Sequence, residues 1–246
     1  MAELSGLGQA AFWMIFAGLV LGAAVQRLAG QGFGLISAPI VAIFAPEMVP
    51  AVLLLLGLLS GFGATALDLS AVKRDELPFG FAGRALGAVA AVWIITILPG
   101  RDTVSIAVAM IVLLAVMLSL LGLTIPIRRG TLFGAGLAAG IMGTLTAIGA
   151  PPMAMLYQRE APRRSRAMQS TFFLFGMVVS IAALIWAGLI GAAQVWFAVA
   201  AAPAIVAGTV LAQPMARFVG QAMVRPMALG FSTLAALILL VKTVLS

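Results

Sequence analysis

Apolar runs separated by short polar or glycine-rich stretches follow one another along the whole chain. They cover residues 8–28, 34–45, 48–69, 78–98, 103–124, 131–148, 151–157, 167–190, 194–215 and 223–245. A helix of about 20 apolar residues crosses a bilayer, so seven of the runs are long enough, the run at 131–148 is borderline, and the two shortest are not. The pattern predicts an all-α polytopic membrane protein with about eight transmembrane segments.

Composition places the chain in the same class. Of its 246 residues, 63% are hydrophobic and only 9% are charged, which is typical of an integral membrane protein. The polar loops are too short to build a soluble core, so we expect one transmembrane domain over residues 1–246. The first basic residue is Arg27. The basic start of a cleavable signal is therefore missing, and we expect the first apolar run to remain in the mature protein.

Basic residues gather in four of the predicted loops. They are Lys73 and Arg74, Arg128 and Arg129, the cluster Arg159, Arg163, Arg164 and Arg166, and Arg217 with Arg225. Basic loops stay in the cytoplasm, which also accounts for the net charge of +7 without a nucleic acid partner. Both termini are then predicted on the periplasmic side of a bacterial inner membrane.

This orientation predicts an inverted repeat. The stretch 8–45 would begin and end outside, whereas 131–158 would begin and end in the cytoplasm. Each stretch is then a hairpin, and three crossings follow it. Residues 131–246 would be an upside-down copy of residues 8–124, an arrangement found in many secondary transporters.

Two glycine-rich breaks lie at matching places in the two halves, QRLAGQGFGLISAP at Gln26–Pro39 and GTLTAIGAPP at Gly143–Pro152. Non-helical backbone at membrane depth is tolerated only where it is buried in protein or lines a watery cavity. Broken segments in matching positions point to the substrate site of a transporter. The short helices after the breaks would point their N-termini, with partial positive charge, into the membrane interior. The breaks therefore predict an anion site.

The candidate ligands are groups of the two breaks and of the span that follows the second. They are Gln26, Arg27, Gln31, Gly32, Phe33, Gly34, Ser37, Thr144, Thr146, Gly149 and Gln169. The backbone amides of 32–35 and 148–149 belong to the same prediction, and Arg84 and Arg166 are predicted to line a cytoplasmic vestibule. The alternative is structural: glycine and threonine permit close helix packing, and Arg27 and Arg84 would snorkel to the interface.

Four segments resemble one transporter family. They are GQGFGLISAP at Gly30–Pro39, LDLSAVKRDEL at Leu67–Leu77, AGRALGA at Ala82–Ala88 and MGTLTAIGAPP at Met142–Pro152. Together with the order of the spans, they are similar to the TauE/SafE (TSUP) sulfite and organosulfonate exporters over nearly the whole chain. The resemblance implies export of a small sulfur-containing anion, such as sulfite, sulfoacetate or a related organosulfonate.

Missing residue types exclude several other functions. The chain has no Cys and no His, so thiol chemistry and the commonest metal ligand are absent, and we expect no enzyme, metal or cofactor. The seven carboxylates fall at span ends or in loops, so no buried proton or sodium site is evident. Outward diffusion of the anion, driven by the membrane potential, needs no coupling ion.

Other classes stay open at this point. An anion channel or a carrier of a small non-sulfur carboxylate would share all of these features. The chain could also be a membrane subunit of a larger assembly, or pair with a second copy as a homodimer. The transported anion and the lipid bilayer are the partners that the sequence itself requires.

Overall fold

The structure is a computed structural model that describes residues 8–29, 32–65, 69–97, 101–218 and 221–245. Its α-helices are α1 Gln9–Ala29, α2 Phe33–Phe44, α3 Ala51–Thr65, α4 Leu77–Ile97, α5 Arg101–Leu121, α6 Arg129–Thr146, α7 Ala150–Tyr157, α8 Pro162–Trp186, α9 Ala192–Phe218 and α10 Gln221–Leu245. Short 3-10 turns are η1 Pro46–Met48, η2 Leu69–Ala71 and η3 Arg74–Glu76. No strand occurs among the described residues. Each predicted apolar run is a helix, which confirms the all-α class.

Four of these helices, over the part of the chain that is described, are long and apolar enough to cross a bilayer. They are Gln9–Ala29, Arg74–Ile97, Pro162–Trp186 and Ala192–Ala212. Shorter apolar helices accompany them, at Phe33–Phe44, Ala51–Phe62, Ser105–Leu121 and Leu229–Leu245. The chain is therefore a multi-pass membrane protein, and the number of about eight crossings stays a prediction.

Helix α8 begins before the apolar run predicted at 167–190. Pro162 occupies its first turn, where a proline loses no hydrogen bond because the first amides of a helix have no intrahelical partner. Arg163, Arg164 and Arg166 then lie at the start of the helix, ahead of its apolar part. Helix α8 therefore begins at Pro162, ahead of residue 167, where hydrophobicity alone predicted the run to begin.

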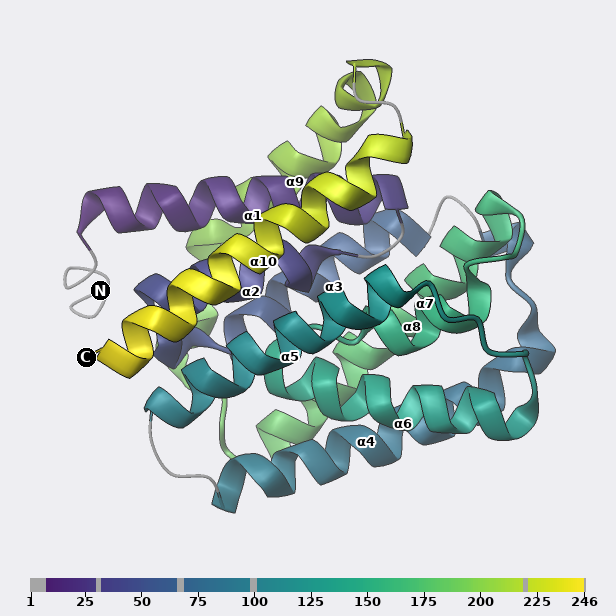
Figure 1. Cartoon of the computed structure of the whole chain (residues 1–246). Coiled ribbons are helices and arrows are strands. Elements are labelled where there is room, and N and C mark those ends of the chain that lie inside the picture. The colour runs from purple at the N-terminus through teal and green to yellow at the C-terminus, as the bar shows by residue number, and fades with distance from the viewer. Residues whose placement is uncertain (1–7, 30–31, 66–68, 98–100, 219–220, 246) are drawn as a thin grey trace.

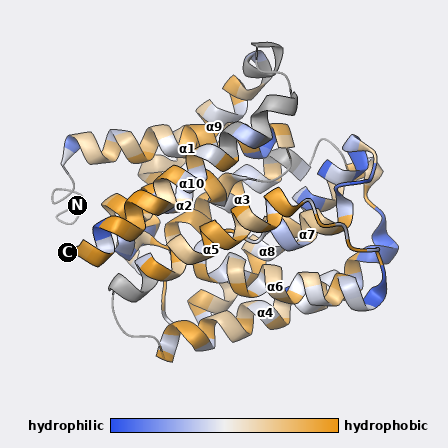
Figure 2. Ribbon diagram, viewed as in Figure 1, coloured by the Kyte–Doolittle hydropathy of each residue, from blue (hydrophilic) through white to orange (hydrophobic). Residues whose placement is uncertain are grey.

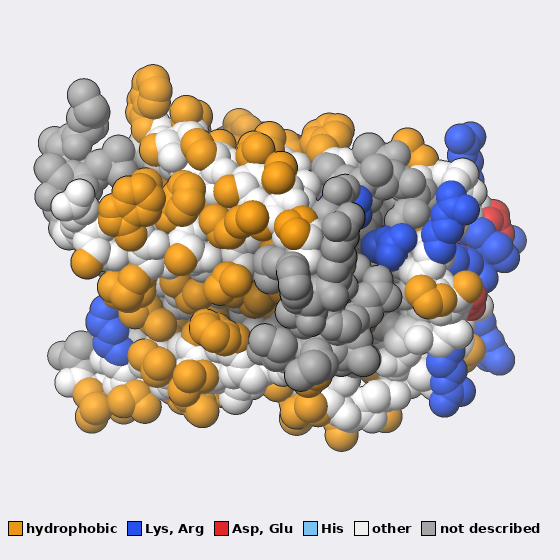
Figure 3. Space-filling model, turned by 90° about the horizontal axis from the view of Figure 1, so that it is seen from above, with side chains coloured by type: hydrophobic (Ala, Val, Ile, Leu, Met, Phe, Trp, Pro, Cys, Tyr) orange, Lys and Arg blue, Asp and Glu red, His pale blue; other side chains and the backbone are white. Residues whose placement is uncertain are grey.

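Most charged residues of the described chain lie at one end of the helical bundle. The stretches 69–76, 122–128 and 158–166, which we call the basic end, lie together at the right of Figure 1, and the most hydrophilic colours of Figure 2 gather there. Helix α1 begins and α10 ends at the opposite end. Figure 3 shows most of the Lys, Arg and acidic side chains of the visible face at the basic end and hydrophobic side chains over much of its remainder.

All four tryptophans of the chain lie towards the end opposite the basic end. Trp13 is near the start of α1, Trp93 near the end of α4, Trp186 at the end of α8 and Trp196 near the start of α9. Each is more than half exposed. Tryptophan collects at membrane–water interfaces, where its ring is partly apolar and its N–H stays wet. The exposed tryptophans thus gather towards one end of the bundle and the basic loops towards the other.

Two helix pairs approach each other closely through glycine. Helix α4 packs along α6, where a Cβ on Gly87 would overlap the Leu137 carbonyl oxygen. Helix α9 packs along α1, where a Cβ on Gly208 would overlap the Val20 carbonyl oxygen. Small residues permit this backbone approach in membrane bundles. Helices α3 and α8 pack against each other between these two pairs.

Candidate functional site

The two predicted breaks touch each other inside the bundle. The first lies between α1 and α2, where Gly32 has a φ of 119° immediately before Phe33. The second lies between α6 and α7, where Ala147 has a φ of 61°. A Cβ on Gly34 would overlap the Ala147 carbonyl oxygen, so only glycine permits this approach. Both segments are buried, and the structure brings the two breaks to one place.

In the first break, a neutral side chain completes the backbone. Gln26 is fully buried, and its Oε1 accepts a hydrogen bond from the Phe33 N–H at 3.3 Å. The Ser37 hydroxyl donates to the Gly18 carbonyl at 3.4 Å. Arg27 lies half-buried in the last turn of α1. Gln31, another predicted ligand, lies outside the described residues.

In the second break, threonine hydroxyls satisfy local groups. Thr146 Oγ1 donates to the Met142 carbonyl at 2.8 Å and accepts from the Ile148 N–H at 3.3 Å. Thr144 Oγ1 and Ser180 Oγ share a hydrogen bond at 2.6 Å. The Ile148 amide, which the sequence suggested as an anion donor, is therefore already engaged. A local bond between neighbouring residues satisfies it.

Helix α7 also offers fewer amides than a helix N-terminus usually does. It begins at Ala150, and the next two residues are Pro151 and Pro152, which have no N–H. The Gly149 amide precedes them. The positive end of α7 therefore contributes less to an anion site than the sequence argument assumed.

Arg84 is buried in the interior, with 3% of its surface exposed. Helices α4 and α6 both begin at the basic end (Figure 1). A Cβ placed on Gly136 or Gly140 would come within 3.1 Å of the Arg84 backbone, whereas the Arg84 guanidinium lies further along α6, beside Gly143. The charge is thus deeper in the bundle than its own backbone. A snorkelling arginine would extend the other way, so the snorkelling interpretation of Arg84 is wrong.

Three glycines surround the Arg84 guanidinium. They are Gly143 of α6, Gly149 in the second break and Gly176 of α8, and a Cβ on any of them would overlap guanidinium nitrogens. Nε and Nη1 of Arg84 are buried and form no hydrogen bond within the described part of the chain. The carboxyl end of α6 supplies only partial negative charge nearby. The structure thus holds an unpaired cation next to the second break.

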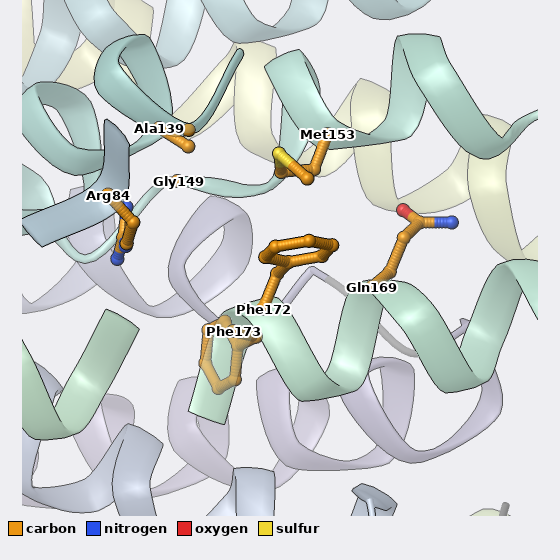
Figure 4. A pocket seen from close by; sticks show the side chains of 8 residues that line it. Arg84, Ala139, Gly149, Met153, Gln169, Phe172 and Phe173 are labelled. Atoms are coloured by element: carbon orange, nitrogen blue, oxygen red, sulfur yellow. The ribbon is translucent and has the colours of Figure 1, made fainter. Parts of the chain in front are cut away.

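A small cavity of about 10 Å³ lies beside Arg84, close to the smallest space that holds one water. Figure 4 shows Arg84 on one side of it, Gln169 on the other, and Phe172 with Met153 between them. Gln169 Nε2 donates to Ser165 Oγ at 2.8 Å, while its Oε1 is buried without a partner in the described structure. The cavity has two polar ends and an apolar middle.

Aromatic rings pack around Phe172, which lines this cavity between Arg84 and Gln169 (Figure 4). Phe172 meets Phe81 edge to face at 5.4 Å between ring centroids, and Phe81 stacks on Phe175 at 3.7 Å. Tyr157 lies tilted against Phe172 at 6.1 Å. Edge-to-face and stacked rings are favourable packing arrangements. The layer joins α4, α7 and α8 on the cytoplasmic side of Arg84 in the predicted orientation.

An ion-pair network at the basic end joins α8 to the segment before α4 and to the loop after α7. Arg164 Nη2 lies 2.6 Å from Glu76 Oε1, and its Nη1 lies 2.6 Å from Glu160 Oε2. The Tyr157 hydroxyl donates to Glu76 Oε2 at 2.9 Å. Burial, followed by the bond to Glu76, raises the pKa of Tyr157, so the phenol keeps its proton. Arg166 lies half-buried at this basic end, well separated along α8 from Gly176, beside which Arg84 lies.

Comparison with known families decides the class. The family model described as sulfite exporter TauE/SafE matches residues 14–239. The chain belongs to the TauE/SafE family. No curated protein and no solved structure matches it.

TauE/SafE proteins are membrane transporters and not enzymes, and the family indicates a membrane exporter of sulfite or a related sulfur anion. In this TauE/SafE chain the breaks that carried the resemblance are the segments that meet at Gly34 and Ala147. The vestibule pair predicted from sequence is divided: Arg166 lies at the basic end and Arg84 lies inside.

Sequence reasoning missed two residues of this region. Gly176 of α8 touches the Arg84 guanidinium, and Ser180 of α8 bonds to Thr144. A signal was present, because Gln169, Phe172 and Gly176 recur at helical spacing and so share one face of α8. Nothing in the chain order indicated that this face would meet Arg84.

Proposed function

We propose that this TauE/SafE protein exports a small sulfur oxyanion, such as sulfite, sulfoacetate or another organosulfonate, across the bacterial inner membrane. The observation that carries the proposal is the contact between the two helix breaks at Gly34 and Ala147. It supports one shared site in the interior, because backbone that leaves the helical ladder there must face protein or a watery cavity. Matching broken segments are the usual position of a transporter's substrate.

The proposed ligands come from both breaks and from α8. Backbone amides of Gly32, Gly34 and Gly149 would approach the anion, and glycine leaves room for that approach. The Phe33 amide would join them by exchanging its present bond to Gln26. Side-chain donors would be Gln26, Arg27, Gln31 and Gln169. The hydroxyls of Ser37, Thr144 and Thr146 would join them by exchanging their present bonds to Gly18, Ser180 and Met142. Hydrogen-bond donors placed around the oxygens would replace part of the water that the anion loses on entering the bundle.

We infer further that the halves 8–124 and 131–246 form an inverted repeat. The packing of α4 on α6 and of α9 on α1 supports this, because each pair joins the fourth helix of one half to the first helix of the other. The basic loops support a cytoplasmic position for the basic end, and the exposed tryptophans support an interface at the opposite end. Both termini would then be periplasmic, with about eight crossings in all.

Transport would require the two ends of the bundle to open in turn. The aromatic layer and the network around Arg164 join α4, α7 and α8 at the basic end, so separation of these helices would admit an anion from the cytoplasm. An inside-negative potential contributes about 2.3 kcal/mol per charge per 100 mV to outward movement. This electrical contribution drives export without a coupling ion.

Flux in proteoliposomes tests this function. We expect saturable efflux of sulfite and of a short sulfonate, with accelerated exchange when substrate is present on both sides. Gly34→Val, which would push the breaks apart, should abolish the flux, whereas Gly130→Val changes an open position with no atom near its Cβ and should not. High unitary conductance would indicate a channel, and transport of a short carboxylate but no sulfur anion would reject the proposed substrate.

A further inference from the structure

We propose that the Arg84 guanidinium is the ion-pair partner of the transported anion and that the site selects singly charged oxyanions. The probe class is a singly charged sulfonate or hydrogen sulfite, as opposed to a dianion such as sulfate or sulfoacetate, so this inference narrows the proposed substrates and removes sulfoacetate from them. This inference rests on the proposed function, because it assigns the charge that compensates the substrate. Nothing in the family match identifies this residue.

The first step is the cost of the unpaired cation. Arg84 is 3% exposed, and its Nε and Nη1 have no partner within the described chain. An uncompensated buried charge is strongly destabilising, and buried polar groups in native proteins almost always have partners. An intramembrane arginine held in this way indicates a functional role. An anion bound beside Nε and Nη1 would compensate this charge.

The second step is the shape of the surroundings. Gly143, Gly149 and Gly176 come from three separate segments, and each lacks the Cβ that would displace the guanidinium. A guanidinium fork binds sulfonate-type oxygens in pairs. The adjoining cavity of about 10 Å³ admits only a water, so the anion needs the volume held by Phe172, which faces the cavity (Figure 4). Binding is thereby coupled to movement of the aromatic layer.

The third step is the charge count. Among the helices packed around Arg84, which are α4, α6, α7 and α8, the other ionisable charges lie near the basic end: Arg129, Arg163, Arg164 and Arg166. Arg27, at the first break, is only half-buried, so Arg84 is the arginine whose charge is buried away from water. Glu76 and Glu160 of that end are paired with Arg164. One positive charge in a low-dielectric interior neutralises one negative charge. A dianion would bring a second charge into the site without compensation.

Purified protein and proteoliposomes test the assignment with methanesulfonate and sulfate as probes. Methanesulfonate should raise the thermal unfolding midpoint of the wild type, because a ligand stabilises the state that binds it, and sulfate at equal concentration should not. Arg84→Gln should remove this response and lower methanesulfonate flux by about 10- to 100-fold, the loss expected for charge-assisted hydrogen bonds. Arg159→Gln, an exposed arginine of the basic end, is the matched control and should behave as the wild type.

A second pair of variants keeps the charge. Gly143→Ala places a Cβ where the guanidinium lies, whereas Gly134→Ala on the same helix meets no atom within 4 Å. We expect the first to weaken the methanesulfonate response and the second to leave it unchanged. This pair remains informative if Arg84→Gln does not fold.

The outcomes separate the inference from the proposed function. Wild-type flux that Arg84→Gln retains, together with an intact methanesulfonate response, overturns the Arg84 assignment and leaves export standing. A methanesulfonate response that requires Arg84 without any flux supports the site and rejects export. Equal stabilisation by sulfate overturns the selection of single charges, and the absence of both flux and response rejects site and function together.

Discussion

In both helix breaks a buried backbone N–H needs an acceptor, and different side chains supply it. In the first, the buried amide of Gln26 accepts the Phe33 N–H, and the completed group is neutral. In the second, Thr146 satisfies the Ile148 amide, and a buried arginine lies alongside. Neutral groups complete the backbone in both breaks, but the arginine at the first, Arg27, is half-buried, whereas Arg84 beside the second is buried. The difference shows that two similar breaks can form a site whose charge comes from one side.

The position of the second half that is equivalent to Arg84 in the proposed repeat carries no charge. The offset of 121 residues that relates Gly87 to Gly208 relates Arg84 to Ile205. Ile205 is 2% exposed and belongs to the hydrophobic core. The proposed repeat therefore keeps the close helix packing and not the charge. A one-sided charge matches a singly charged substrate.

A second charge at the equivalent position of the other half would break this asymmetry most severely. Ile205→Arg would bury an uncompensated cation, so we expect a loss of about 3–5 kcal/mol in the free energy of unfolding. Thermal unfolding in detergent measures this effect. Ile205→Met is the control, since a volume-conserving change costs less than about 1.5 kcal/mol. Wild-type stability of Ile205→Arg would contradict the one-sided description.

Separating the two breaks is expected to have the next largest effect. Gly34→Ala would press a methyl group against the Ala147 carbonyl, and overpacking of this kind costs about 1–3 kcal/mol. Unfolding midpoints and sulfonate flux should both fall. Gly134→Ala, with open space around its Cβ, should instead keep its flux and gain slightly in stability, because alanine favours helix over glycine.

The first break can be tested through the hydrogen bond that the Phe33 N–H donates to Gln26 Oε1. Gln26→Leu would leave the buried Phe33 N–H without its acceptor, which costs about 1–3 kcal/mol in unfolding free energy. Gln194 offers a matched control, because its Oε1 accepts the Gly191 N–H at 3.0 Å in an exposed position. Water replaces that bond in Gln194→Leu, so its midpoint should change little. Equal effects of the two variants would mean that burial of the first break is unimportant.

The smallest effect is expected in the second break. Thr146→Val keeps the side-chain shape and removes the hydroxyl that serves Met142 and Ile148, at a cost of about 0.5–1.5 kcal/mol. Thr209→Val is the comparison, because that hydroxyl only donates back to its own helix at Ile205 and no amide depends on it. A larger loss for Thr209→Val would show that Thr146 is not needed by the break.

Much of the architecture could be predicted from the order of residues. The runs at 34–45 and 151–157 correspond to the short helices α2 and α7, because glycine and proline interrupt the helical pattern beside them. The start of α8 was missed, since hydrophobicity does not register a basic first turn after Pro162. Candidate ligands at the breaks were identified by residue type, but their existing partners, such as Met142 for Thr146, could not be.

The sequence by itself determined the helical membrane class, the gathering of basic loops at one end, the position of the breaks and the family. Each of these depends on local composition and spacing, which the chain order contains. Tertiary structure alone decided that Gly34 meets Ala147 and that Arg84 turns inward among three glycines. Those contacts join segments far apart in the chain, and whether an arginine snorkels or stays buried depends on the helices packed around it.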